Sequence, residues 1–244
     1  MRQYPFPWDL FIALSRTLPS GYRSLAADSA LLVSRIRPAP VVGGIEHIPR
    51  QGPLIIACNH YQRRGLWVGW PGSVATLAIA EQRGNDPPIH WLATGGLRVF
   101  QWRGDGPAIP LSGVLFRRVA GIYGMTALPL TDARKRAGAV RSWLHWCDRG
   151  EVIGLFPEGL AGRSDGVRQP DPGFGRLARR FGQIPTLPVG IHEADGTLHV
   201  QFGTPLRPLP EAQGEDIMRA IASLLPDSLR GAYRDQGAGI GALD

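Results

Sequence analysis

The sequence has 244 residues, of which 27 are Lys or Arg and 20 are Asp or Glu, so its formal net charge is +7. With 43% hydrophobic residues, this length fits one globular domain with a small appendage. The 32 glycines and 22 prolines indicate many loops but stay below the content of collagen-like or disordered chains. Two cysteines cannot supply a disulfide framework, and no signal peptide opens the sequence. We therefore expect a cytosolic or cytosol-facing protein.

No apolar run is long enough to cross a bilayer, which takes about 18 residues or more. The nearest approach, residues 65–80, is too short and is interrupted by Gly, Pro, Ser and Thr. We therefore expect no membrane-spanning helix. The basic charge favours an anionic partner, which could be nucleic acid, an acidic carrier protein or a membrane surface.

Residues 1–37 carry two apolar stripes at helical spacing. The first stripe comprises Leu10, Phe11, Leu14 and Leu18, and the second comprises Tyr22, Leu25, Leu32, Val33 and Ile36. A break at residues 19–21 separates them, so the pattern predicts two short amphipathic helices. Because arginines border both stripes, the pair suits a helical hairpin lying on a membrane. The alternative is that both stripes pack on the core of the protein itself.

From residue 38 onward, strand-like and helix-like segments alternate. The expected strands cover residues 41–46, 54–58, 89–93, 127–130, 151–156, 186–191 and 198–202. The expected helices between and after them cover about residues 66–82, 111–123, 133–148, 174–181 and 215–225. This alternation predicts an α/β domain with a mostly parallel twisted sheet covered by helices, which we place at residues 38–235. A flexible tail is expected at residues 236–244.

Several common catalytic motifs are absent from the sequence. It contains no Gly-x-Ser-x-Gly, no His-Glu-x-x-His and no Walker A loop, and its histidines and cysteines lack the spacing of zinc ligands. Serine-hydrolase, zinc-protease and P-loop functions are therefore disfavoured.

Asn59 and His60 follow the apolar strand at residues 54–58. Ligands of open α/β sheets bind at the carboxyl ends of the strands, so this position is a candidate site. A neutral imidazole there could act as a general base on a hydroxyl group. The alternative is a histidine with a purely structural role.

A second candidate motif, Phe156, Pro157, Glu158 and Gly159, closes another apolar strand, and Arg163 follows in the next loop. Its carboxylate could bind substrate hydroxyls or organise arginines that hold a phosphate. The alternative is an acidic residue of a turn or helix start. Parallel strands would bring this motif and His60 to the same edge of the sheet.

Four segments, at residues 42–49, 52–60, 156–159 and 187–191, occur in an order and spacing that resemble the PlsC-like acyltransferases. These are the lysophospholipid and glycerol-phosphate acyltransferases. The resemblance covers about residues 41–202 and implies transfer of a fatty acyl group from acyl-CoA or acyl carrier protein to a hydroxyl of a lysophospholipid or related glycerolipid. It implies that His60 is the base and that the Phe-Pro-Glu-Gly segment lines the acceptor site.

The N-terminal helices also resemble a membrane-docking pair found in that family, which favours membrane contact over core packing for them. The implied partner is an anionic membrane surface, and the implied location is the cytoplasmic side of the cell membrane, at its inner face.

Two departures from the family pattern bear on catalysis. The Asp expected five positions after the histidine, where it would hold the imidazole, is replaced by Gly65. In the serine-protease triad, loss of such a carboxylate costs about four orders of magnitude in turnover, or roughly 5 kcal/mol. Another acid could substitute, the backbone could orient the ring, or the protein could be inactive. The candidate acids are Glu81, Asp86 and Asp105.

The second departure concerns the arginine that holds the substrate phosphate. Asp132 occupies its place, and Arg134 lies just beyond. Arg134, Arg63 or Arg64 could bind the phosphate instead, although each could equally be a solvated surface residue.

The leading hypothesis is therefore a peripheral membrane acyltransferase in which His60 deprotonates the acceptor hydroxyl. Asn59 and backbone donors would stabilise the tetrahedral oxyanion. The acyl thioester is a co-substrate, and no metal or bound cofactor is expected. A catalytically silent lipid- or acyl-binding relative is the alternative that Gly65 favours. Nucleic-acid binding rests on charge alone and is not expected.

Overall fold

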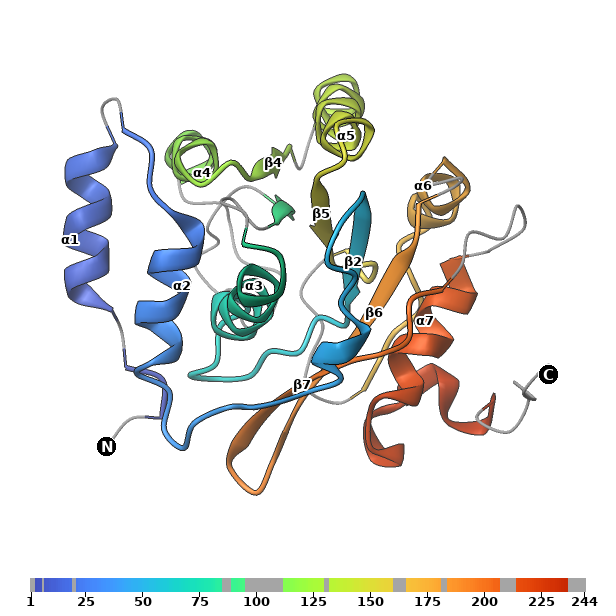
Figure 1. Cartoon of the computed structure of the whole chain (residues 1–244). Coiled ribbons are helices and arrows are strands. Elements are labelled where there is room, and N and C mark those ends of the chain that lie inside the picture. Colours follow the sequence, from blue (N-terminus) through green and yellow to red (C-terminus); the bar gives the residue numbers. More distant parts are fainter. Residues whose placement is uncertain are drawn as a thin grey trace.

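The computed structural model describes residues 3–5, 7–18, 21–84, 89–94, 112–129, 132–159, 166–180, 184–206 and 214–236. Within them, helices surround a seven-stranded sheet (Figure 1). The strands are β1 (Val41–Gly43), β2 (Leu54–Cys58), β3 (His90–Thr94), β4 (Thr126–Leu128), β5 (Val152–Leu155), β6 (Thr186–Ala194) and β7 (Thr197–Phe202). Their order across the sheet is β1-β7-β6-β2-β5-β3-β4.

The described strand pairs are parallel except for β6 and β7, which form an antiparallel hairpin. Asp195 and Gly196 join them with left-handed φ angles of 49° and 72°, which suits a tight hairpin turn. The predicted α/β fold with a mostly parallel sheet is confirmed.

β2 lies between β5 and β6, where Ile56 is paired with Gly154 on one side and Leu187 on the other. All five residues of β2 are buried, as expected of an apolar run in a sheet covered on both faces. Because the three strands are parallel, their carboxyl ends open at one edge. The segment that follows β2 therefore lies between the ends of β5 and β6.

The helices are α1 (Trp8–Thr17), α2 (Leu25–Val33), α3 (Gly69–Arg83), α4 (Ser112–Ile122), α5 (Ala133–Asp148), α6 (Phe174–Arg180) and α7 (Gly214–Ser223). Side chains of β2 alternate between two cores. Leu54 and Ile56 join the core cluster that contains α3, whereas Ile55 and Ala57 join the cluster that contains residues of α5, α6 and α7. Figure 1 shows α3 on one side of the sheet and α6 and α7 on the other.

Short 3-10 helices cover Ile45–His47, Asp227–Leu229 and Gly231–Gln236. The first begins after Gly44, whose φ of 70° ends the strand, so β1 is shorter than the strand expected at residues 41–46. The tail expected at residues 236–244 lies outside the described residues apart from Gln236, the last residue of a 3-10 helix.

The two N-terminal helices differ in how closely they pack against the rest of the domain. In α2, the buried Asp28 carboxylate accepts hydrogen bonds from Arg23 at 2.6 and 2.7 Å and from the Tyr123 hydroxyl at 2.6 Å. No side chain described in α1 is buried, and Trp8, Phe11 and Ile12 are 67%, 52% and 48% exposed. α2 is therefore part of the domain, whereas α1 lies outside it with an exposed apolar surface (Figure 1).

Candidate active site

His60 and Glu158 meet at the adjacent ends of β2 and β5. The backbone N–H of His60 donates to Glu158 Oε1 at 2.7 Å, and the backbone N–H of Arg168 donates to Oε2 at 3.2 Å. The strand-end prediction that brought these two residues to one edge is confirmed. The Glu158 carboxylate thus holds the backbone of the loop that carries the histidine.

The Phe-Pro-Glu-Gly segment forms a tight turn. The Gly159 N–H donates to the Phe156 carbonyl at 3.0 Å, and the Asp171 N–H donates to the Pro157 carbonyl at 2.9 Å. Gly159 has a φ of +78°, and a Cβ there would come within 3.1 Å of the Asp171 side chain. The left-handed backbone therefore favours glycine, and a larger residue would also press on the Asp171 side chain.

The imidazole of His60 lies beside the aromatic ring of Phe156. Its ring centroid is 5.0 Å from that of Phe156, which stacks on Trp91 at 5.4 Å. Burial lowers the pKa of His60 to about 4, because an apolar environment disfavours the charged imidazolium. The ring is therefore neutral at physiological pH and has a nitrogen able to accept a proton.

His60 Nδ1 is buried and has no hydrogen-bond partner within the described part of the chain. The expected carboxylate position, Gly65, has a φ of +88° in a turn closed by reciprocal backbone bonds of 3.3 and 3.0 Å between Arg63 and Leu66. This left-handed conformation favours glycine. Of the candidate substitute acids, Glu81 is exposed on α3, and Asp86 and Asp105 lie outside the described residues.

Asn59 connects the start of the His60 loop to β6 through hydrogen bonds. Its buried side-chain amide donates to the Ile191 carbonyl at 2.8 Å and accepts from the Ile191 N–H at 2.7 Å. The side chain thereby continues the pairing of β2 with β6 beyond the end of β2. Its contribution to an oxyanion site stays a prediction.

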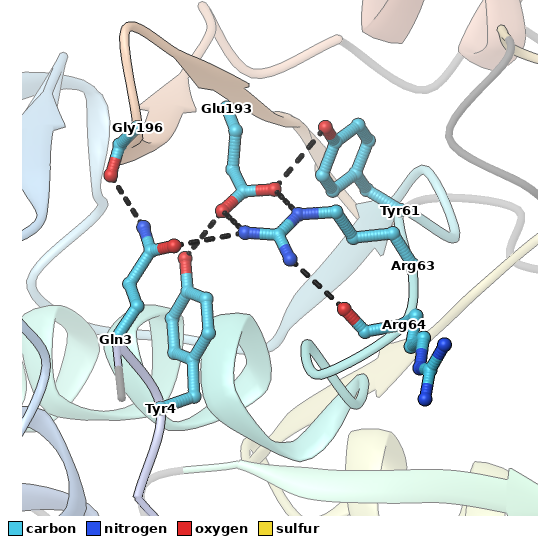
Figure 2. A network of polar contacts seen from close by, with 7 residues as sticks. All are labelled: Gln3, Tyr4, Tyr61, Arg63, Arg64, Glu193 and Gly196. Atoms are coloured by element: carbon cyan, nitrogen blue, oxygen red, sulfur yellow. Dashed lines mark hydrogen bonds and ion pairs between the residues drawn. The ribbon is translucent and has the colours of Figure 1, made fainter. Parts of the chain in front are cut away.

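The arginines of the predicted site have different surroundings. Arg63 and Arg64 are both exposed in the same turn, and Arg63 forms an ion pair with Glu193 of β6 (Figure 2). Arg134 is exposed in the first turn of α5, which Asp132 caps by accepting from the Lys135 N–H at 3.0 Å. Arg163 lies outside the described residues. A phosphate-binding role for any of these arginines stays a prediction.

Comparison with known proteins identifies the family of the chain. The family model described as Acyltransferase matches residues 39–192, more than half of the chain. The chain belongs to the acyltransferase family. The matched region contains Asn59, His60 and the whole Phe-Pro-Glu-Gly turn, and α1 and α2 precede it.

The fold of this acyltransferase is similar to a solved structure, the crystal structure of the 1-acyl-sn-glycerophosphate (LPA) acyltransferase PlsC from Thermotoga maritima. The sequences are 16% identical, the alignment covers 97% of this chain and 86% of that chain, and the TM-score is 0.52. At this identity the likeness concerns the fold. A search of curated proteins found no significant match.

Among the residues of the acyltransferase chain that contact the His60 loop, Glu193 and Tyr4 were not predicted from the sequence. Glu193 lies on β6, two residues beyond the strand expected at residues 186–191, so the strand-end argument that found Glu158 could have found it. Tyr4 had no such signal, because it precedes the loop by more than fifty residues and follows no strand.

Three further features of the described residues concern metal binding, membrane crossing and the thiol of Cys58. No group of three or more His, Cys, Asp or Glu among them is arranged to hold a metal ion. None of the helices in the described ranges is long and apolar enough to cross a membrane. Cys58 is fully buried, and burial raises the pKa of its thiol, as is typical of a small core residue.

Proposed function

We propose that this acyltransferase moves a fatty acyl group from acyl-CoA or acyl carrier protein to a hydroxyl of a lysophospholipid or related glycerolipid acceptor. The observation that carries the proposal is the neutral, half-buried His60 beside the Phe-Pro-Glu-Gly turn, whose glutamate bonds to the backbone of His60 at 2.7 Å. Family membership supports the reaction class, and the fold likeness to PlsC supports a glycerolipid acceptor.

In the proposed mechanism, His60 accepts the proton of the acceptor hydroxyl as its oxygen attacks the thioester carbonyl. Asn59 and nearby backbone N–H groups stabilise the negative charge on the carbonyl oxygen of the tetrahedral intermediate. The intermediate then expels the thiolate, which takes the proton back from His60. The products are an acylated acceptor and a free thiol, so atoms and charge balance without a metal or bound cofactor.

The lack of a described hydrogen-bond partner for His60 Nδ1 favours a second candidate function. When Nε2 serves as the base, Nδ1 carries the proton, and that N–H has no acceptor among the described residues. An imidazolium formed during the reaction would also lack a facing carboxylate at Gly65. A lipid- or acyl-binding relative that has lost catalysis is therefore the alternative to the transferase.

The exposed apolar side chains of α1 support docking on a membrane. Trp8, Phe11 and Ile12 share this helix with Arg16, and the chain carries a net charge of +7. An amphipathic helix with exposed aromatic rings and neighbouring positive charge suits the interface of an anionic membrane. We place the protein on the inner face of the cell membrane, where a lysophospholipid acceptor would be presented.

The test is mass-spectrometric detection of acylated product when the protein and liposomes are offered acyl-CoA or acyl carrier protein with a panel of lysophospholipid, glycerol-phosphate and glycolipid acceptors. Product should vanish with His60→Ala and decrease with Glu158→Ala, which removes the acceptor of the His60 N–H. His145→Ala, at an exposed histidine of α5, is the matched control and should leave product formation unchanged.

Absence of product from every donor and acceptor, while the protein still binds liposomes, would refute the transferase for the panel tested. That result would support the lipid-binding alternative.

A further inference from the structure

The loop after His60 is held by a second carboxylate, Glu193, at the end of β6 (Figure 2). Glu193 accepts two hydrogen bonds from the guanidinium of Arg63, one from Nη2 at 2.6 Å and one from Nε. It also accepts from the Tyr4 hydroxyl at 2.8 Å and the Tyr61 hydroxyl at 3.5 Å. Its side chain is only 8% exposed, so the carboxylate depends on these partners for its stability.

Arg63 is the centre of this network, and each of its side-chain nitrogens donates within the chain. Besides its bonds to Glu193, Nη2 donates to Gln3 Oε1 at 2.8 Å, and Nη1 donates to the Arg64 carbonyl at 2.9 Å. The guanidinium also lies 5.8 Å from the ring centroid of Tyr4. Two parallel donors to one carboxylate fix the orientation of the guanidinium as well as its position.

The other side of the network is the segment that leads into α1. Tyr4 is buried and packs 5.7 Å from Trp70 of α3, and Gln3 donates to the Gly196 carbonyl in the β6–β7 turn. Burial and the bond to Glu193 raise the pKa of the Tyr4 hydroxyl, which therefore stays a donor across the physiological range. The chain enters α1 four residues later, at Trp8.

We propose that Gln3, Tyr4, Arg63 and Glu193 form a clamp that fixes the His60 loop and joins it to the N-terminal segment, with Arg63 as a positioning residue. Three polar contacts would then hold the loop: Asn59 with Ile191, the His60 N–H with Glu158, and Arg63 with Glu193. The third contact anchors the turn that contains Gly65, the position at which the family resemblance implies a carboxylate. The catalytic consequence rests on the proposed function, whereas the clamp itself does not.

The clamp gives Arg63 a role different from that of a phosphate ligand. A ligand arginine presents unused donors to the substrate, but this guanidinium already serves a buried carboxylate and the N-terminal segment. Its replacement should therefore loosen the loop even when no substrate is present.

The test is hydrogen exchange of the backbone amides of Tyr61, Arg63 and Leu66, measured by mass spectrometry without substrate. These amides are bonded within the loop, to the carbonyls of Asn59, Leu66 and Arg63 respectively. Arg63→Gln and Tyr4→Phe should each accelerate their exchange, by roughly tenfold for Arg63→Gln, as expected from the loss of charge-assisted bonds. The effects of the two changes should not add, because both act through Glu193.

Arg35→Gln is the matched control. It breaks the ion pair with Asp9, which also involves an N-terminal helix but not the loop, and should leave exchange in the loop unchanged. Thermal unfolding of each variant separates local loosening from failure to fold. Because Tyr4→Phe removes only a hydroxyl group, it tests the clamp even if Arg63→Gln does not fold.

Unchanged exchange at the loop in both variants would overturn the clamp. Unchanged exchange together with a raised KM for phosphate-bearing acceptors would identify Arg63 as a substrate ligand instead. In an active enzyme, the clamp predicts a lower kcat with little change in acceptor KM for Tyr4→Phe. If the unaltered chain transfers no acyl group, the proposed function fails, and the exchange measurement still decides the clamp.

Discussion

Replacing His60 by glutamine removes one half-buried titrating group, and the effect on stability depends on pH. Burial lowers the pKa of His60 from 6.5 to about 4 in the folded protein. Between these values the unfolded chain binds a proton that the folded protein excludes, so acid favours unfolding. The free energy of unfolding should therefore fall as the pH falls from 6.5 towards 4. The difference between the two pKa values corresponds to about 3 kcal/mol at most.

The assay is urea denaturation of the unaltered protein and of His60→Gln at several pH values between 4 and 7.5. Subtracting one stability curve from the other removes the contribution of shared groups, including His90 and His192, whose pKa values are also lowered by burial. The difference should be constant above pH 7. Below it, the unaltered protein should lose up to about 3 kcal/mol relative to the variant. Curves that stay parallel across this range would refute the argument that the fold keeps His60 neutral.

Two further predictions concern the turn after the histidine and the surface of α1. In urea denaturation, Gly65→Ala should lower the free energy of unfolding by about 1–2 kcal/mol, because φ is +88°. Gly65→Asn should lower it by less, because Asn adopts left-handed φ angles more readily. Space is not the cause, since the nearest atom to an added Cβ is Arg63 Nη1, at 3.9 Å. Equal stability of all three proteins would mean that the turn relaxes. The double change Trp8→Ala and Phe11→Ala should weaken binding to anionic vesicles at least about tenfold without changing the thermal midpoint, since both side chains are exposed. Ile45→Ala, at an exposed residue outside the N-terminal helices, is the control, and an equal loss of binding there would contradict docking through α1.

Local patterns in the sequence were sufficient to predict most elements of the fold. The strand at residues 54–58 was predicted with its observed bounds, because an apolar run follows Gly52 and Pro53 and ends at the polar Asn59. The helix at residues 133–148 was also predicted with its observed bounds, and Asp132 caps its first turn. Periodicity and end signals such as these act over a few residues, so they can be read without knowing the rest of the structure.

The strand-end argument also predicted part of the site. His60 and Glu158 were expected at one edge of a parallel sheet, and a 2.7 Å hydrogen bond joins them. What the sequence could not specify was the kind of contact, in which the carboxylate binds the backbone of His60 and leaves the imidazole Nδ1 without a described partner. That outcome depends on the path of the loop, which the turn around Gly65 sets.

Tertiary structure alone decided which distant groups surround Glu193. Arg63 pairs with Glu193, and Tyr4 reaches the same carboxylate from the other end of the chain. These partners are 130 and 189 residues apart in sequence, and they meet because β2 lies beside β6 and the N-terminal segment contacts the end of β6 and the turn after it. Hydrophobic periodicity determines whether a segment forms a helix or a strand. It carries no information about strand order, and strand order determines which charges become partners.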